Sequence, residues 1–145
     1  MLYNKEDIKR IIPHRDPMLM IDEILEVKEN EEGKKVIVGK KVFTGEEGFF
    51  KGHFPSLPVV PGVLVLESIA QTGAVYALSL DEYKGKTGFL VGAENVKWRR
   101  SVLPKDTLIL EVTEVKIRHG IGKCEGKAYV NGALACQAEL VVAIQ

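Results

Sequence analysis

The sequence has no surplus of charge of either sign. Its twenty lysine and arginine residues are balanced by twenty aspartate and glutamate residues, so the formal net charge at pH 7 is zero. Proteins that bind nucleic acid or an anionic membrane through their overall electrostatic field need a clear positive excess. We therefore expect neither partner, and any charged partner must dock on a local patch.

Cysteine is scarce, and the two cysteines, Cys124 and Cys136, have neither CxxC nor zinc-site spacing. A two-residue hairpin turn at Asn131-Gly132 places Cys124 opposite Glu139 and Cys136 opposite Lys127. The cysteines then miss each other by three positions, which is too far for a disulfide. We predict two small, buried, free thiols.

The sequence also lacks a P-loop, a GxGxxG or GxSxG motif, and any metal-ligand spacing. Its apolar run near the N-terminus is short and is interrupted at residues 14–16. The long apolar stretch after Pro61 contains Glu67 and Gln71, which is typical of a buried helix rather than a membrane span. We expect a soluble, cytoplasmic protein without a bound metal.

The sequence does have enough apolar residues for a core, since 46% of its 145 residues are hydrophobic. This length suits one domain over residues 1–145. The pattern predicts helices over residues 5–12 and 61–80, and strands over residues 18–29, 35–44, 87–100 and 107–118 and on both sides of Asn131-Gly132. Short turns between the last four strands indicate an antiparallel meander. The predicted fold is α+β, with a long central helix wrapped by a curved antiparallel sheet of about six strands.

Only two side chains between Lys51 and Asp81 ionise near neutral pH, His53 and Glu67. His53 precedes Phe54-Pro55 in a stiff loop, and an imidazole is suited to accept a proton near pH 7. Glu67 lies in an apolar helix, where we expect burial to keep it protonated, as a general acid requires. The alternatives are a loop histidine bonded to the backbone and a structural glutamate bonded to Gln71.

Pro61-Gly62-Val63 marks the start of the long helix. The N–H groups of Gly62 and Val63 have no acceptor in the first turn and lie at the positive end of the helix dipole. Such donors can hold a carbonyl oxygen that gains negative charge. A base, an acid and these donors together suit removal of a proton next to a carbonyl, although simple helix initiation also explains the motif.

Three cations gather at Lys97, Arg99 and Arg100. Strand alternation predicts Lys97 and Arg99 on one face, and Trp98 and Arg100 on the other. The cluster is either a docking patch for an acidic partner or a solvated strand end. The long helix is apolar on nearly every face, and one sheet can cover only part of such a helix. We therefore expect a partner subunit to cover the rest.

Four segments together resemble the 3-hydroxyacyl-acyl-carrier-protein dehydratases of the FabZ type, which have the hotdog fold. Residues 12–17 are similar to the family's PHRxP segment, residues 52–62 to GHFPxxPxxPG, residues 66–71 to LEAMAQ and residues 96–100 to the start of KFRRxVxPGD. The resemblance covers almost the whole chain. Val60 stands where Met is frequent, Ser68 replaces Ala, and Lys105 replaces Gly.

The resemblance implies dehydration of (3R)-3-hydroxyacyl-acyl-carrier-protein to the trans-2-enoyl product in type II fatty acid biosynthesis. His53 of one subunit and Glu67 of its dimer mate form the catalytic pair, and the Gly62 N–H binds the thioester carbonyl. No cofactor is expected, because the thioester itself acidifies the α carbon. The implied partners are an acyl carrier protein bearing 3-hydroxyacyl-phosphopantetheine and further copies of the chain, as a homodimer or a trimer of dimers.

The resemblance also implies an acyl tunnel at the dimer interface, lined by Phe54, Val60 and Phe89. Lys97, Arg99 and Arg100 form the implied carrier-protein patch at the mouth of the site.

Three other functions remain open at this point. A hotdog thioesterase uses a similar carboxylate to activate water, and a non-catalytic module binds an acyl carrier protein without forming a product. A dehydratase that also isomerises the double bond tends to have Asp where Glu67 stands, which argues against that branch.

Overall fold

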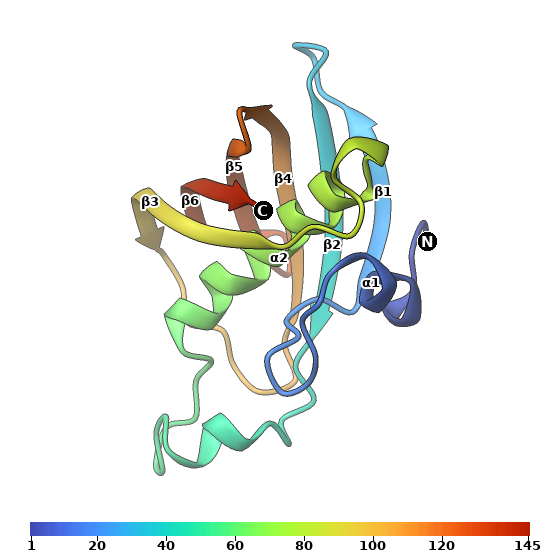
Figure 1. Ribbon diagram of the computed structural model, residues 1–145. Coiled ribbons are helices and arrows are strands. Elements are labelled where there is room, and N and C mark those ends of the chain that lie inside the picture. The colour runs from blue at the N-terminus through green and yellow to red at the C-terminus, as the bar shows by residue number, and fades with distance from the viewer.

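The computed structural model describes residues 1–145, except for the side chains at positions 114 and 115. Along the chain lie α1 (Lys5–Ile11), β1 (Glu23–Glu29), β2 (Lys35–Val42), the 3-10 helix η1 (Gly48–Lys51), α2 (Gly62–Ser79), the 3-10 helix η2 (Asp81–Tyr83), β3 (Gly88–Trp98), β4 (Thr107–Arg118), β5 (Ile121–Val130) and β6 (Ala133–Ile144). The strands form one curved sheet that wraps around α2 (Figure 1). The predicted α+β arrangement of a long helix in a curved antiparallel sheet is confirmed.

The sheet has six strands in the order β1-β2-β4-β5-β6-β3, and every neighbouring pair is antiparallel. The predicted meander holds for β4, β5 and β6 but is wrong for β3, which pairs with β6 instead of β4. Strand β4 lies at the centre of the sheet, where its apolar face packs beneath α2. Its two edges pair with β2 and β5, so β3 cannot pair with it. The connection over residues 99–106 therefore carries the chain from the edge of the sheet to its middle.

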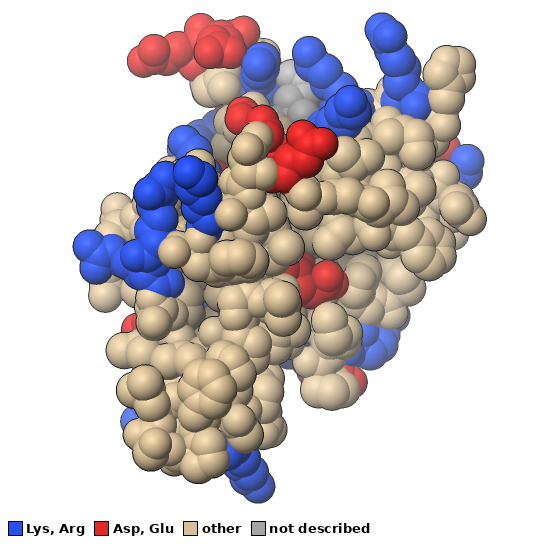
Figure 2. Space-filling view, turned by 90° about the vertical axis from the view of Figure 1, so that its left-hand side faces the viewer, with Lys and Arg blue, Asp and Glu red and all other residues tan. Residues whose placement is uncertain are grey.

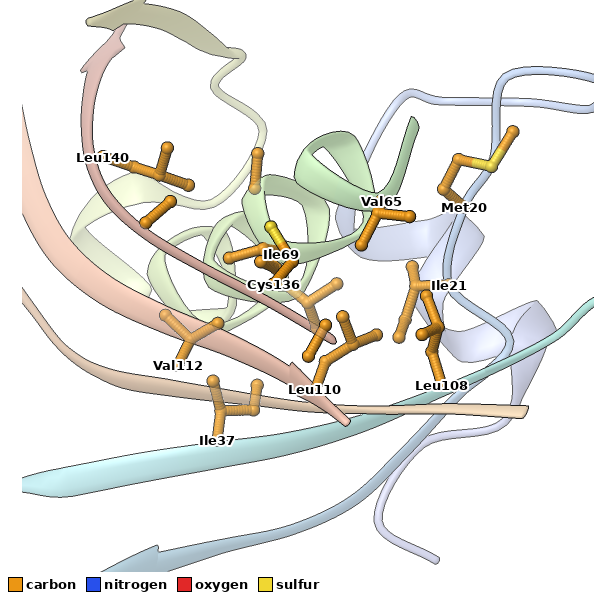
Figure 3. Close-up of a cluster of buried hydrophobic side chains, with 14 of the residues drawn as sticks. Met20, Ile21, Ile37, Val65, Ile69, Leu108, Leu110, Val112, Cys136 and Leu140 are labelled. Atoms are coloured by element: carbon orange, nitrogen blue, oxygen red, sulfur yellow. The ribbon is translucent and has the colours of Figure 1, made fainter. Parts of the chain in front are cut away.

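The core lies between α2 and the concave face of the sheet (Figure 3). Val65 and Ile69 of α2 face Leu108, Leu110 and Val112 of β4, and all five side chains are buried. The helix comes so close to β5 that a Cβ atom at Gly126 would lie 2.1 Å from Cγ2 of Ile69. A glycine is therefore required at this point of the sheet.

The segment before β1 was predicted to be strand from residue 18 onward, but β1 begins only at Glu23. Met18 and Met20 do not join the sheet here, because their backbone groups bond to the side chain of Gln71. The N-terminal helix is confirmed, and Asn4 and Asp7 cap it reciprocally.

Asn131 and Gly132 both have positive φ and connect β5 to β6 in the predicted two-residue turn. A β-bulge between Ala128 and Tyr129 then shifts the register, so Cys124 faces Leu140 and Cys136 faces Ala128. The predicted facing residues were therefore wrong, because the bulge cannot be read from the turn. Both cysteines are free and buried, as predicted.

By length and composition α2 could cross a membrane, with a mean hydropathy of 1.2, and half of it is buried inside the fold. A buried core helix meets the same criteria, so this finding is weak evidence for a membrane span.

Candidate active site

His53 lies in a loop whose backbone is paired on both sides. The N–H of Val59 donates to the carbonyl oxygen of His53 across 2.9 Å, and the N–H groups of Phe54 and Leu57 each donate to the other's carbonyl oxygen. The Phe54 ring stacks on the imidazole with the ring centres 4.1 Å apart. The loop therefore holds the imidazole in one place, as its proline content indicated.

Of the two ring nitrogens of His53, Nδ1 alone has a hydrogen-bond partner among the residues that the structure describes. Its Nδ1 lies 3.0 Å from the carbonyl oxygen of Val59, which can only accept a hydrogen bond. The proton of the neutral ring is therefore on Nδ1, and Nε2 carries the lone pair. The sequence left open that His53 is only a loop histidine bonded to the backbone. The bond to Val59 is present, and it also selects the tautomer that a general base needs.

His53 and Gly62 line the same pocket, of about 340 Å³, together with Val60, Arg99 and Arg100. Pro61 is the N-cap of α2, and the first backbone donors to its carbonyl are Leu64 and Val65. The N–H groups of Gly62 and Val63 thus precede the hydrogen-bonded part of the helix. The base candidate and the positive end of the helix dipole meet in one cavity, as the motif predicted.

Glu67 lies on α2, in a different pocket of about 80 Å³ that no residue of the His53 pocket lines. Its Oε2 accepts a hydrogen bond from the side-chain amide of Gln71, at 2.7 Å. The Glu67 side chain is 21% exposed, between alanine and leucine side chains of α2 and the strands β3 and β6. The predicted contact with Gln71 is present, and within one protomer the structure keeps Glu67 apart from His53.

His14 and Arg15 contact different parts of the molecule. His14 places Nε2 3.6 Å from Oε2 of Glu67, and its buried Nδ1 has no hydrogen-bond partner among the described residues. Arg15 instead donates to the carbonyl oxygens of Lys9 and Ile12 and so caps the end of α1. His14 braces the site, and Arg15 braces the helix before it.

The remaining candidates divide between the two pockets and the surface. Val60 is buried in the His53 pocket, while Phe54 and Phe89 are half exposed. Phe89 lies on β3 between Gly88 and Leu90, which line the Glu67 pocket.

The basic cluster is only partly where alternation placed it. Strand β3 ends at Trp98, so Arg99 and Arg100 belong to the following loop and line the His53 pocket beside the indole. The predicted separation of Arg99 from Trp98 is therefore wrong, while Lys97 is exposed on β3 outside that pocket. Figure 2 shows one group of basic side chains at the left edge of the molecule and others along its top, with a broad uncharged surface between and below them.

Trp98 is the site residue that sequence reasoning missed. Its indole N–H donates to the carbonyl oxygen of Gly62 across 2.8 Å, and a Cβ atom at Gly62 would lie 2.8 Å from the indole nitrogen. The available signal was that this chain's only tryptophan directly precedes the two arginines.

Among the described side chains, no group of three or more His, Cys, Asp or Glu residues could hold a metal ion.

The comparisons with known proteins place the chain in one family. A family model described as a FabA-like domain matches residues 12–139. The chain is 52% identical over 141 residues to a Roseiflexus protein named 3-hydroxyacyl-[acyl-carrier-protein] dehydratase FabZ, covering 96% of this chain and 94% of that one. It is 47% identical over 140 residues to the Oceanobacillus iheyensis protein of the same name, covering 97% of both chains.

Solved structures are similar in fold at low sequence identity. A chain of the dehydratase heterocomplex ApeI:P from Xenorhabdus doucetiae superposes with a TM-score of 0.74 at 18% identity, covering 95% of this chain and 90% of that chain. A thioesterase from Haemophilus influenzae superposes with a TM-score of 0.65 at 15% identity, covering 100% of this chain and 92% of that chain. These matches establish the hotdog fold. With its family-model match and its nearly full-length FabZ relatives, the chain belongs to the FabA-like family of dehydratases, in its FabZ branch.

Proposed function

We propose that the protein dehydrates (3R)-3-hydroxyacyl-acyl-carrier-protein to trans-2-enoyl-acyl-carrier-protein in fatty acid biosynthesis. The observation that carries the proposal is the hydrogen bond from His53 Nδ1 to Val59, in a pocket shared with Gly62. It leaves Nε2 as a base next to donors suited to a thioester carbonyl. The near-full-length relatives named as FabZ dehydratases support the same reaction.

In the proposed reaction, Nε2 of His53 removes a proton from the α carbon while the N–H of Gly62 holds the thioester oxygen as it gains charge. The electron pair of the broken C–H bond forms the new double bond between the α and β carbons. The bond from the β carbon to its hydroxyl breaks, and protonated Glu67 gives its proton to the leaving group, which departs as water. His53 and Glu67 then return to their starting protonation states by exchange with solvent.

We propose that the Glu67 in this step belongs to a second copy of the chain. The His53 and Glu67 pockets of one protomer share no lining residue, so the pair needs another source for its acid. Strand β3 ends the sheet order, and beyond it no described strand pairs with its outer edge. Its Phe89, Leu90 and Val91 are 50%, 42% and 58% exposed, an apolar edge that favours pairing with another subunit. A homodimer, assembled further as a trimer of dimers, is the proposed form.

The proposed acyl tunnel runs along Phe54, Val60 and Phe89 at this dimer interface. The apolar lining of the Glu67 pocket, which includes Leu90 and Val142, supports an acyl chain on that side.

The acyl carrier protein is proposed to dock on the exposed side chains of Lys97, Arg99 and Arg100. Two of these line the mouth of the His53 pocket, so an acidic carrier bound there has a short path for its phosphopantetheine arm. The proposed location is the cytoplasm.

The decisive experiment is incubation of the protein with 3-hydroxybutyryl-acyl-carrier-protein, with the absorbance of the conjugated enoyl thioester as the readout. Mass spectrometry of the product separates the candidate activities. A loss of water from the acyl group supports the dehydratase. Free 3-hydroxybutyrate would instead indicate a thioesterase, and binding without any product would indicate a carrier-binding module.

A further inference from the structure

The indole of Trp98 covers the first residue of α2. Its N–H donates to the Gly62 carbonyl oxygen at 2.8 Å, and its Cε2 and Cδ1 atoms would lie 3.0 and 3.1 Å from any Cβ at that residue. Nothing larger than glycine fits under the ring without displacing it. The indole and the start of the helix are thus fitted to each other by a hydrogen bond and by direct contact.

This hydrogen bond acts on the peptide unit that joins Gly62 to Val63. The peptide bond is planar, so the carbonyl of Gly62 and the N–H of Val63 form one rigid unit and point in opposite directions. A donor that fixes the carbonyl therefore also fixes the N–H. Donation to the carbonyl additionally polarises the unit and makes its N–H a stronger donor.

The N–H of Val63 has no hydrogen-bond acceptor among the described residues, so it can serve a ligand. The first turn of α2 uses Leu64 and Val65 as its donors to Pro61, which leaves the N–H groups of Gly62 and Val63 at the exposed end of the helix. The start of α2 adjoins the pocket of His53, because Gly62 and Trp98 both line that pocket.

A β-bulge brings Trp98 to this position. The register between β3 and β6 shifts between Glu94 and Lys97, and Asn95 within the bulge has a positive φ. Beyond the bulge Trp98 pairs with Cys136, the last pair of the strand. Bulges commonly redirect side chains beside functional sites, and here the redirected side chain reaches the start of α2.

We propose that Trp98 is a positioning residue for the oxyanion site, which holds the Gly62–Val63 peptide so that the Val63 N–H joins the Gly62 N–H as a second donor to the thioester oxygen. This inference rests on the proposed dehydration and deepens it. The indole itself does not touch the reacting atoms, and it acts through the peptide that it fixes.

The test removes the indole N–H. Trp98→Phe does so by mutation and leaves a smaller aromatic ring at this position. Because Trp98 is the only tryptophan, global replacement of tryptophan by benzothienylalanine does so with the ring shape unchanged. Loss of one hydrogen bond that strengthens a transition-state donor is expected to lower kcat about five- to tenfold, with KM changed by less than about twofold. Tyr83→Phe, which alters an aromatic residue on η2, is the matched control and should leave both constants unchanged.

A second readout separates positioning from mere support of the fold. Crotonyl-pantetheine labelled with ¹³C at its carbonyl is bound to His53→Ala protein with and without Trp98→Phe, and the infrared stretch of the carbonyl is compared. A second donor lowers that frequency, so we expect a higher frequency when Trp98 is replaced.

An unchanged kcat in both indole-free proteins, or a lower kcat with an unchanged carbonyl frequency, overturns the proposal. If the wild-type protein turns over no 3-hydroxyacyl thioester, the proposed function is contradicted instead, and the infrared comparison still decides the role of Trp98.

Discussion

The side-chain amide of Gln71 donates a hydrogen bond to Oε2 of Glu67 across 2.7 Å, from one turn further along α2. The same nitrogen donates to the carbonyl oxygen of Met18 at 2.8 Å, and the amide oxygen accepts from the N–H of Met20 at 2.7 Å. Gln71 is only 1% exposed. A single buried side chain thus ties the proposed acid to the segment that leads into β1.

Replacing Gln71 by Leu should lower the free energy of unfolding by about 2–4 kcal/mol, because backbone groups of Met18 and Met20 lose their buried partners. Urea denaturation measures the loss. Gln137→Leu is the matched control, since Gln137 is half buried on β6 and accepts one long hydrogen bond from Arg99. A loss below about 1 kcal/mol for Gln71→Leu would show that this network contributes little.

His53→Ala and Glu67→Gln should each lower the dehydration rate by a factor on the order of 10²–10⁴, because each removes one partner in proton transfer. Steady-state assays with 3-hydroxybutyryl-acyl-carrier-protein measure the loss, and circular dichroism verifies that both variants stay folded. His119→Asn is the control, since His119 is a turn residue with positive φ, which asparagine tolerates. Near-normal turnover in either active-site variant would contradict the assignment.

Mixing the two inactive variants tests whether the site is shared between subunits. After exchange of subunits, a mixed dimer has one site with His53 from one chain and Glu67 from the other. An equal mixture should therefore regain about a quarter of the wild-type activity, since half of the dimers are mixed and each has one intact site. A site contained within one protomer predicts no recovery, because no chain in the mixture carries both residues.

Charge reversal at Lys97 and Arg100 should raise KM for the acyl-carrier-protein substrate by about tenfold at low salt, because both side chains are exposed next to the site. The effect should shrink as salt is added. KM for the same acyl group on free pantetheine should not change. Lys127→Glu, on the outer face of β5, is the control. Equal effects on both substrates would contradict a carrier-protein patch.

Burial raises the pKa of both Cys124 and Cys136 to about 11. In the unfolded chain a thiol ionises near pH 9, so between about pH 9 and 11 the folded state binds more protons than the unfolded one. The thiols therefore stabilise the fold fully below pH 9 and lose this contribution as the pH rises through 11.

We expect the free energy of unfolding, measured by urea denaturation, to fall between about pH 9 and 11. The fall should be larger in the wild type than in a Cys124→Ala, Cys136→Ala double variant, by about 1 kcal/mol or more. The double variant serves as the reference because all other titrating groups are the same in both proteins. Parallel curves for the two proteins would contradict the raised pKa values.

Much of the local structure could be predicted from the sequence, because its causes lie within a few residues. Asn4 and Asp7 cap α1, and Asn131-Gly132 closes the last hairpin. The start of α2 follows Pro61, whose carbonyl begins the helix. The two ionisable side chains in an apolar stretch, and the motifs around them, also led to the prediction of His53, Gly62 and Glu67 as site residues.

The tertiary structure alone decided which segments meet. Sequence could not show that β3 pairs with β6, because the choice depends on β4 filling the centre of the sheet beneath α2. Nor could it show the bulges that shift Cys124 and Cys136 and redirect Trp98. A bulge changes the alternation of faces, but Leu134, Ala135 and Cys136 are all apolar, so the change in β6 is hidden in the sequence. The contacts of Gln71 with Met18 and Met20 span about fifty residues of chain. Such contacts are selected by the free energy of burying the whole helix in its sheet, whereas turns and caps are selected by the residues that form them.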